Sequence, residues 1–479
     1  MRKILLIIAT LVTTFTLLAC TPDTEEQKTE TMLPYLNVYY LNDTHGAILP
    51  ASDQIGLSSI ASLTTQEEDY TIVLSGGDML QGTALSNYYK GSSMIEIMNV
   101  MSFDAMTLGN HEFDWGLETV TNYFNEESDE YIAEFPLLAA NAFYKGTETI
   151  PEGISPYTII NKGTLNIGII GAIGSGLESS IATSMVEDYE FKNPLPYIEQ
   201  YATYLRTEEQ VDMVLVVLHE TSNALNNQIA FLEGDAKIDG LFNAHAHQVM
   251  NTSINDVPLL QSGDNGEMVG YIRYEFNESY SDYTYSIENL RKEDQNAFYT
   301  THVETQSLID TYTAETDELF NEVLMISQRG LAQTELSIFI AEVMKNATNS
   351  DIGFQNGGGT RNSIDQDEPI DLALLYQIWP FDNIVKTVYL NGAQIKSLMN
   401  QYIYQTDITN FDDDTLYKVA TNDYVFDKPD NPFIYGDDIV NTYLNMRELA
   451  FLEIKLQSYI YDFFNTTNDI QITEESLTE

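Results

Sequence analysis

The sequence has almost no cysteine and few basic residues. Its 479 residues include a single cysteine, so the chain cannot form an internal disulfide and must depend on a packed core. Lys and Arg together number 21 against 73 Asp and Glu, which gives a formal net charge of −52. Because affinity for DNA or RNA comes from cations that neutralise phosphates, this balance excludes a nucleic acid polymer as a partner. A small phosphate ester remains a candidate ligand, provided that the cations that hold it are local.

The chain also lacks an apolar run long enough for a comfortable membrane crossing, which takes about 20 residues. The run Ile4–Leu18 follows Arg2 and Lys3 and ends in Leu-Leu-Ala-Cys20, a pattern typical of an export signal over residues 1–20. This end resembles the lipobox of bacterial lipoproteins. The resemblance implies lipidation of Cys20 and anchoring at the outer face of the cell membrane; a plain secretory signal is the alternative. Residues 21–33 are polar and lack periodicity, so we expect a flexible tether.

Beyond the tether, short apolar runs alternate with amphipathic segments. The expected strands are Leu36–Leu41, Thr71–Leu74, Pro136–Ala140, Leu165–Gly171, Val211–Leu218 and Ile238–Phe242. Helical spacing marks Ser92–Met101 and Pro196–Glu209 between them. This alternation predicts an α/β protein.

The length of the chain favours two or three domains. We expect a first domain over 34–287, closed by consecutive strands at Met268–Phe276 and Tyr283–Ile287. A linker helix is expected within 288–327, a second α/β domain over 328–470, and an acidic tail over 471–479.

Polar residues gather where several of the expected strands end. The stretch Thr107–Gly116, TLGNHEFDWG, places an amide, an imidazole and two carboxylates directly after an apolar run. Three similar clusters are Asn42-Asp-Thr-His-Gly46, Ser75-Gly-Gly-Asp78, and His219 with His245-Ala-His247. Five of the six histidines lie at these strand ends. Because open α/β sheets bind ligands at the carboxyl ends of their strands, the clusters predict one common site.

Seven of these side chains offer imidazole nitrogen or oxygen donors and no sulfur: Asp43, His45, Asp78, Asn110, His219, His245 and His247. Such donors suit Zn²⁺, Mn²⁺ or Fe. Seven ligands are more than one four-coordinate ion can bind, and the number fits two ions that share a carboxylate. Asp78, which follows two glycines in a tight turn, is suited to be the shared carboxylate. Two such ions about 4 Å apart hold both oxygens of a phosphoryl transfer and activate water. His111 is expected to point beside the ions, with Asp114 fixing its tautomer.

Taken together, these motifs closely resemble those of the calcineurin-like metallophosphoesterases. The intact Asn110-His-Glu-Phe-Asp114 is similar to the signature of the 5′-nucleotidase family within them. The resemblance implies a four-layer α/β/β/α first domain with His111 and Asp114 as the catalytic pair. It also implies two divalent metal ions, one bound by Asp43, His45 and His247, the other by Asn110, His219 and His245, and both by Asp78.

The second half of the chain carries the resemblance further. Phe354–Ile364, FQNGGGTRNSI, resembles the family's glycine-rich loop, which implies substrate contacts at Asn356, Gly358 and Arg361. Three glycines let backbone N–H groups approach an anion, and an arginine adds a planar donor fork. Pro380-Phe-Asp-Asn383 is similar to a motif whose Phe, here Phe381, stacks on the base of a nucleotide. The resemblance also implies a hinge motion about the linker.

One departure bears on the substrate. The family's Gly-Gly-Asp-Gly segment, which brings a second aromatic ring over the base, is absent, and residues 424–433 read YVFDKPDNPF. The sequence therefore supports phosphate chemistry better than nucleoside recognition. We expect a surface-anchored two-metal phosphohydrolase, most simply a 5′-nucleotidase that acts on extracellular nucleotides. A 2′,3′-cyclic-nucleotide phosphodiesterase with 3′-nucleotidase activity, a nucleotide-sugar hydrolase and a non-catalytic surface binding protein stay open as alternatives.

Overall fold

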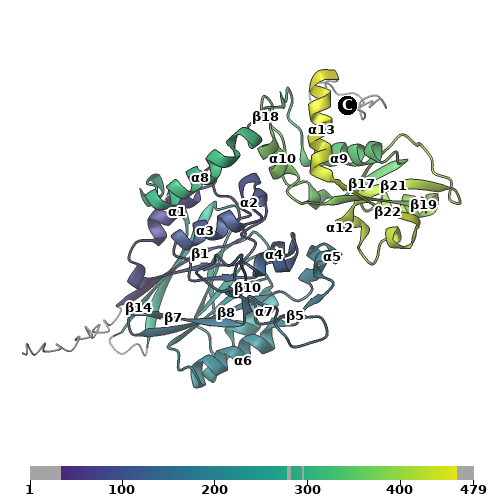
Figure 1. Ribbon diagram of the computed structural model, residues 1–479. Helices are drawn as coiled ribbons and strands as arrows, with labels where there is room; N and C mark the ends of the chain where they lie inside the picture. The colour runs from purple at the N-terminus through teal and green to yellow at the C-terminus, as the bar shows by residue number, and fades with distance from the viewer. Residues whose placement is uncertain (1–33, 278–281, 294–295, 461–479) are drawn as a thin grey trace, which may run out of the picture.

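A computed structural model describes residues 34–277, 282–293 and 296–460 and folds them into two α/β domains joined by helix α8, Val303–Phe320 (Figure 1). The export signal, Cys20, the tether and the acidic tail lie outside these residues. None of the helices in the described ranges combines the length and apolar character that crossing a bilayer requires.

The first domain contains a mixed seven-stranded sheet with the order β15-β14-β1-β2-β3-β4-β6. Strands β1, β2, β3, β4 and β6 are parallel neighbours, and β14 and β15 continue the sheet antiparallel. The strands are β1 Tyr35–Leu41, β2 Thr71–Ser75, β3 Ala105–Thr107, β4 Leu137–Leu138, β6 Ile154–Ser155, β14 Met268–Phe276 and β15 Tyr283–Arg291. All residues of β2 and β3 are buried, as expected for strands covered on both faces.

A six-stranded sheet with the order β12-β13-β11-β10-β8-β7 packs against the first. Its strands are β7 Tyr157–Lys162, β8 Leu165–Ile173, β10 Met213–His219, β11 Gly240–Asn243, β12 Val249–Ile254 and β13 Val257–Ser262. A short pair, β5 Ala142–Tyr144 with β9 Tyr189–Phe191, lies outside both sheets.

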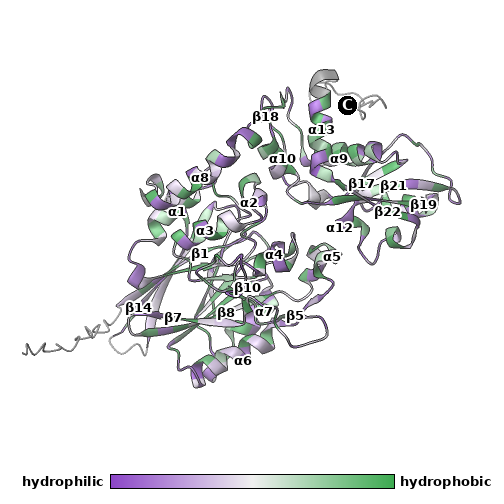
Figure 2. Ribbon diagram, viewed as in Figure 1, coloured by the Kyte–Doolittle hydropathy of each residue, from purple (hydrophilic) through white to green (hydrophobic). Residues whose placement is uncertain are grey.

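Three buried clusters account for the layers of this domain. Val38 and Leu74 of the first sheet and Ile169 and Val217 of the second share the core between the sheets. A second core covers the outer face of the seven-stranded sheet, and a third covers the outer face of the six-stranded sheet. The covering helices are α1 Leu57–Thr64, α3 Ser92–Val100, α4 Leu117–Thr121, α6 Pro194–Thr207 and α7 Asn223–Ala230. The predicted α/β/β/α layering is confirmed; in Figure 2, α6 and α8 alternate between green and purple, as helices with one buried face do.

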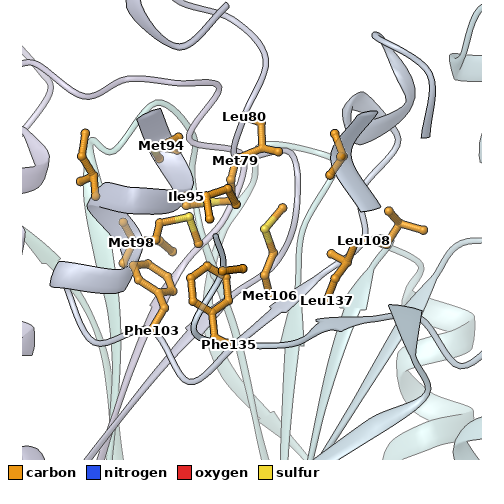
Figure 3. Packing of buried hydrophobic residues seen from close by; sticks show 14 of the residues in the cluster. Met79, Leu80, Met94, Ile95, Met98, Phe103, Met106, Leu108, Phe135 and Leu137 are labelled. Carbon is orange, nitrogen blue, oxygen red and sulfur yellow. The ribbon is translucent and has the colours of Figure 1, made fainter. Parts of the chain in front are cut away.

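The core under the first sheet's helices anchors the loop after β2. Met79 and Leu80 directly follow Asp78 and are fully buried beside Met94 and Met98 of α3 and Met106 of β3 (Figure 3). Burying a side chain of this size stabilises by about 1.5–3 kcal/mol. The backbone that presents Asp78 is therefore held by apolar packing on its outer side.

The second domain is built on a five-stranded sheet with the order β20-β17-β21-β19-β22. Its strands are β17 Ile352–Gln355, β19 Ile384–Asn391, β20 Ile403–Thr406, β21 Leu416–Asn422 and β22 Asp437–Asn445, with a separate pair β16 Met325–Ile326 and β18 Pro369–Ile370. Helices α9, α10 and α13 share one buried cluster, and α11 and α12 belong to another. Their bounds are α9 Gln333–Ala347, α10 Leu372–Ile378, α11 Gly392–Leu398, α12 Asp423–Phe426 and α13 Met446–Ile460, and the first domain adds α2 Ala84–Tyr88 and α5 Thr183–Val186.

Most expected elements are present, and the differences lie at their ends. The expected strand Met268–Phe276 is confirmed as β14. The expected strand Pro136–Ala140 is regular only over two residues, because its neighbour β3 is itself only three residues long. β15 continues to Arg291, four residues past the expected domain end at 287, because it pairs with β14 over its whole length.

Candidate active site

The seven predicted metal ligands lie together at one edge of the two sheets. Each follows the carboxyl end of a strand or terminates it: Asp43 and His45 after β1, Asp78 after β2, Asn110 after β3, His219 at the end of β10, and His245 and His247 after β11. The loops after β2 and β3 touch: a Cβ on Gly77 would come within 2.7 Å of the Gly109 nitrogen. Only glycine permits this approach, which brings Asp78 beside Asn110.

Five of the seven predicted ligands have left-handed backbone conformations. Their φ angles are 49° at Asp43, 49° at His45, 52° at Asp78, 73° at His245 and 52° at His247. Positive φ is uncommon for residues other than glycine and costs on the order of 1–3 kcal/mol each. Such strain persists only where the surroundings hold it, and at these five residues it occurs in turns that bring the side chains into the two groups described next.

Asp43, His45 and His247 form the first group, with ligand atoms that all lie within 4.8 Å of one another. The Nε2 atoms of the two imidazoles are 3.1 Å apart, and Nε2 of His247 is 3.8 Å from Asp43 Oδ1. His45 Nδ1 lies 3.2 Å from the Gln81 carbonyl oxygen, which can only accept a hydrogen bond, so Nδ1 carries the proton. The lone pair of His45 Nε2 therefore faces His247.

Asp78, His219 and His245 form the second group, again within 4.8 Å, with Asn110 beside them. Asn110 Oδ1 lies 3.1 Å from His219 Nε2 and 2.8 Å from His245 Nδ1. Asp78 Oδ2 is 3.2 Å from the same His219 nitrogen. The opposite nitrogen of His219 donates to the Gly76 carbonyl at 2.7 Å, which fixes the ring with Nε2 toward Asp78.

These two donor sets fit a pair of divalent ions. Burial lowers the pKa of His45, and burial together with the charge of His219 lowers the pKa of His245 to about 4. Burial lowers the pKa of His219, whereas the charge of Asp78 raises it, and the balance is a pKa of about 10, so an ion would take the place of the proton on His219 Nε2. A backbone carbonyl on the opposite nitrogen is the usual way to orient an imidazole ligand. The role of each residue as a ligand stays a prediction.

Three residues with no role assigned from the sequence support the ligands: Glu112 and Asn42 are buried, and Asp264 is half-buried. The Glu112 carboxylate accepts hydrogen bonds from the backbone nitrogens of Asp78, Met79 and Gly109 at 2.9, 3.0 and 2.8 Å. Asn42 Nδ2 donates to Asp43 Oδ2 at 2.7 Å, and Asp264 Oδ2 lies 3.4 Å from His247 Nδ1. Glu112 lies inside the Asn-His-Glu-Phe-Asp motif, so its position was visible in the sequence, but its partners were not.

His111 and Asp114 form the predicted pair. His111 Nδ1 lies 2.8 Å from Asp114 Oδ2, and its backbone nitrogen donates to Asp78 Oδ1 at 2.8 Å. Burial lowers the pKa of His111, whereas the charges of Asp114 and Asp78 raise it, and the balance is a pKa of about 9. Divalent ions beside Asp78 would offset its charge, which leaves Asp114 as the partner that favours the imidazolium.

All four predicted substrate residues lie with this pair in one cavity of about 410 Å³ between the domains. The cavity is lined by the predicted residues His111, Asp114, Asn356, Gly358, Arg361 and Phe381, and by Met185, Asn383, Asp423 and Tyr424, which the sequence analysis had not assigned. Tyr424 stands at the start of the segment where the expected glycine motif is missing. Its hydroxyl accepts from Lys428 Nζ at 2.9 Å, and the same Nζ lies 4.2 Å from the ring centroid.

Comparison with known proteins agrees with this geometry. A family model described as calcineurin-like phosphoesterase matches residues 36–249, and one described as 5′-nucleotidase, C-terminal domain, matches residues 312–411. The chain is 26% identical to Endonuclease YhcR of Bacillus subtilis over 70% of this chain and 29% of that protein. It is 25% identical to Cell wall protein Lmo0130 of Listeria monocytogenes over 81% of this chain and 60% of that protein. The chain thus spans less than two thirds of both relatives.

Among solved structures, a 5′-nucleotidase precursor from Thermus thermophilus superimposes with a TM-score of 0.72 at 18% identity. The match covers 88% of this chain and 97% of that one, which shows that both domains share its fold. Metallophosphoesterases of this kind use two divalent metal ions, in agreement with the two ligand groups found here. With a calcineurin-like phosphoesterase domain followed by a 5′-nucleotidase C-terminal domain, the chain belongs to the 5′-nucleotidase family.

Proposed function

We propose that this chain is a two-metal phosphohydrolase that releases phosphate from a nucleoside 5′-monophosphate. The observation that carries the proposal is the shared cavity, in which two ligand groups of the first domain face Arg361 and Phe381 of the second. A phosphate ester has the two parts that such a cavity accommodates. Its anionic end suits the ions and the guanidinium, and its organic end suits the aromatic wall.

In the proposed reaction, the oxygen of a water molecule bonds to phosphorus while the ester P–O bond breaks, giving phosphate and an alcohol. When bound, the two ions would offset charge on the phosphoryl oxygens and lower the pKa of water. Asp43, His45 and His247 would hold one ion, Asn110, His219 and His245 the other, and Asp78 both. His111, oriented by Asp114, would hold a proton near the leaving oxygen and stabilise the charge that develops there.

The aromatic wall favours a nucleotide over a small aliphatic ester. Phe381 and Tyr424 both line the cavity, and they come from separate segments of the second domain. Flat rings of this kind stack on a nucleobase, and a tyrosine after β21 supplies the second ring that the missing glycine motif had put in doubt. Nucleotide sugars and 2′,3′-cyclic nucleotides also carry a base, so they are the competing substrates.

A substrate panel tests the proposal. Purified protein without residues 1–20 is supplied with Mn²⁺ or Zn²⁺, and phosphate release is compared for AMP, a 2′,3′-cyclic nucleotide and UDP-glucose. We expect the highest kcat/KM for AMP. A higher value for either of the others assigns the chain to the corresponding alternative, and turnover of none of them supports a binding protein.

We further propose that the chain acts outside the cell, anchored by a lipid on Cys20. The support is the lipobox-like end of residues 1–20 and the similarity to a cell wall protein. Labelled palmitate fed to expressing cells should be incorporated into the unchanged protein and not into the Cys20→Ser variant. Equal labelling of both would contradict the anchor.

A further inference from the structure

The loop that carries Phe381 into the cavity is held by both domains at one atom. The Pro380 carbonyl oxygen accepts hydrogen bonds from Asn87 Nδ2 at 2.9 Å and from Arg447 Nη1 at 3.1 Å. Asn87 lies on α2 of the first domain, and Arg447 lies on the first turn of α13 in the second. Only 5% of Asn87 and 4% of Arg447 is exposed, so both bonds are shielded from water.

The other end of the Asn87 amide reaches the metal-ligand turn. Asn87 Oδ1 accepts from the Gly82 nitrogen at 2.8 Å. Gly82 packs so closely on His45 that a Cβ there would lie 2.1 Å from the His45 carbonyl oxygen, and the Thr83 nitrogen donates to that oxygen at 3.1 Å. One amide therefore connects the turn that presents His45 with the loop that presents Phe381.

Arg447 fixes the same loop from the opposite side. Its Nη1 also donates to the carbonyl oxygens of Trp379 at 3.0 Å and Phe381 at 3.4 Å, and its Nη2 pairs with Asp382. The guanidinium carbon lies 3.6 Å from the centroid of the Tyr376 ring. Arginine is suited to this role because its planar fork serves several acceptors at once while its face stacks on an aromatic ring.

Aromatic contacts connect Arg447 back to the helix that carries Asn87. Tyr376 packs edge-on against Phe320 of the linker helix with ring centroids 5.8 Å apart. Phe320 packs in the same way against Tyr88, the neighbour of Asn87, at 5.6 Å. A continuous set of contacts through α13, α10, α8 and α2 thus connects the two donors to Pro380 across the domain boundary.

We propose that Asn87 and Arg447 are positioning residues that hold Phe381 in register with the catalytic site, an arrangement named here the Pro380 latch. The inference rests on the proposed function, since it assigns the latch to recognition of the organic part of a phosphate ester. Phe381 meets the substrate ring as a fixed wall only while both bonds to Pro380 are made. A shift of about 1 Å in such a wall is enough to weaken binding strongly.

The substitution Asn87→Asp tests the latch. The carboxylate keeps an acceptor for Gly82 but replaces the donor to Pro380 with a second acceptor, so the cross-domain bond is lost. We expect the KM for AMP to rise about five- to tenfold, the factor that one lost hydrogen bond corresponds to. The kcat/KM for β-glycerol phosphate, which has no flat ring, should change less than twofold. An equal change for both esters, or none for AMP, would overturn the proposal.

Thr183→Val is the matched control. It removes another hydrogen bond between the domains, from Thr183 Oγ1 to the Asp427 carbonyl at 3.1 Å, which does not involve the Phe381 loop. Its KM values should stay within twofold of the unchanged protein. If Thr183→Val reproduces the effect of Asn87→Asp, general contact between the domains is responsible and the latch is wrong.

A double-mutant comparison shows whether Asn87 acts through Phe381. In the Phe381→Ala background, Asn87→Asp should raise the KM for AMP less than twofold further, because the ring that it positions is gone. Independent, additive increases would contradict the latch. Arg447→Lys, which keeps the charge but loses the fork, is the second variant and should give the same pattern.

Trp379 provides a readout that needs no turnover. The chain has two tryptophans, so Trp115→Phe leaves Trp379, whose carbonyl Arg447 holds, as the only one. Asn87→Asp and Arg447→Lys should raise acrylamide quenching of Trp379 at least twofold, and Thr183→Val should not. If the unchanged protein hydrolyses neither ester, the proposed function fails, whereas unaltered quenching in both latch variants overturns the latch itself.

Discussion

The ring of Phe381 stacks on the imidazole of His111, with centroids 5.6 Å apart and planes inclined by 22°. The two residues come from different domains and lie 270 positions apart in the chain (381 − 111), yet they share one wall of the cavity. Because Phe381 covers one face of the imidazole, we expect His111 to meet a substrate through its ring edge, opposite the Nδ1 that faces Asp114. A rotation of the second domain would separate the rings, so the stack depends on the orientation that the two domains have in this structure.

The catalytic pair gives a prediction for turnover. His111→Ala should lower kcat about 10²- to 10⁴-fold, the usual contribution of a positioned acid or base. Metal content should not change, because His111 belongs to neither ligand group. His302→Ala is the matched histidine control: His302 caps α8 by accepting from the Thr305 nitrogen, and its loss should cost only about 1 kcal/mol of stability. A kcat within threefold of the unchanged protein in His111→Ala would remove His111 from the mechanism.

Metal removal gives a second prediction. Dialysis against a chelator should abolish phosphate release, and Mn²⁺ or Zn²⁺ should restore it. Elemental analysis of the reloaded protein should find two ions per chain. The Asp78→Ala variant should contain fewer, because Asp78 belongs to the second ligand group. Activity that survives prolonged chelation would argue against both ligand groups.

Arg361 should act on every substrate alike. Its guanidinium lines the cavity beside the ligand groups, so we expect it to contact the phosphoryl group that all candidate esters share. Arg361→Lys keeps the charge but loses the planar fork, and we expect the KM to rise about tenfold for AMP and for β-glycerol phosphate. A rise for AMP alone would place Arg361 at the organic part of the substrate instead.

Substitution of Tyr424 should affect AMP and leave β-glycerol phosphate unaffected. Tyr424→Ala removes one of the two aromatic walls, and an aromatic pair contributes about 0.5–1.5 kcal/mol beyond area burial. We expect the KM for AMP to rise about two- to tenfold, while the KM for β-glycerol phosphate stays the same. Tyr435→Ala, at a tyrosine that is 75% exposed, serves as the control and should change neither KM.

Glu112 gives a prediction for stability. Its carboxylate accepts three backbone N–H groups in the turns that present Asp78 and Asn110. Glu112→Gln replaces one oxygen by an NH₂ that opposes those donors, so we expect a loss of about 3 kcal/mol, seen as a lower midpoint of thermal unfolding. The exposed Glu118→Gln should change stability by less than about 0.5 kcal/mol. Equal midpoints for the two variants would show that the Glu112 bonds contribute little.

Local sequence patterns correctly predicted the position of residues that directly follow a strand. Asp78 and Asn110 follow short apolar runs at glycines, and parallel strands bring such exits to one edge, so their meeting could be expected. Tyr424 was missed because the expected signal was a glycine motif. The structure instead brings this residue to the cavity from the first turn of α12, whose cap, Asn422, also contacts Asn356 at 3.0 Å.

The sequence by itself determined the chemistry that the candidate metal site offers, since the identity of the seven predicted ligands and their places after strands are local properties that need no long-range contact. It also determined the pairing of His111 with Asp114, three residues apart on one turn. Only the tertiary structure decided what meets across the domains. The bond from Asn87 to Pro380 joins residues 293 positions apart. Such contacts depend on how two separately packed domains are oriented, and no periodicity or motif along the chain encodes that orientation.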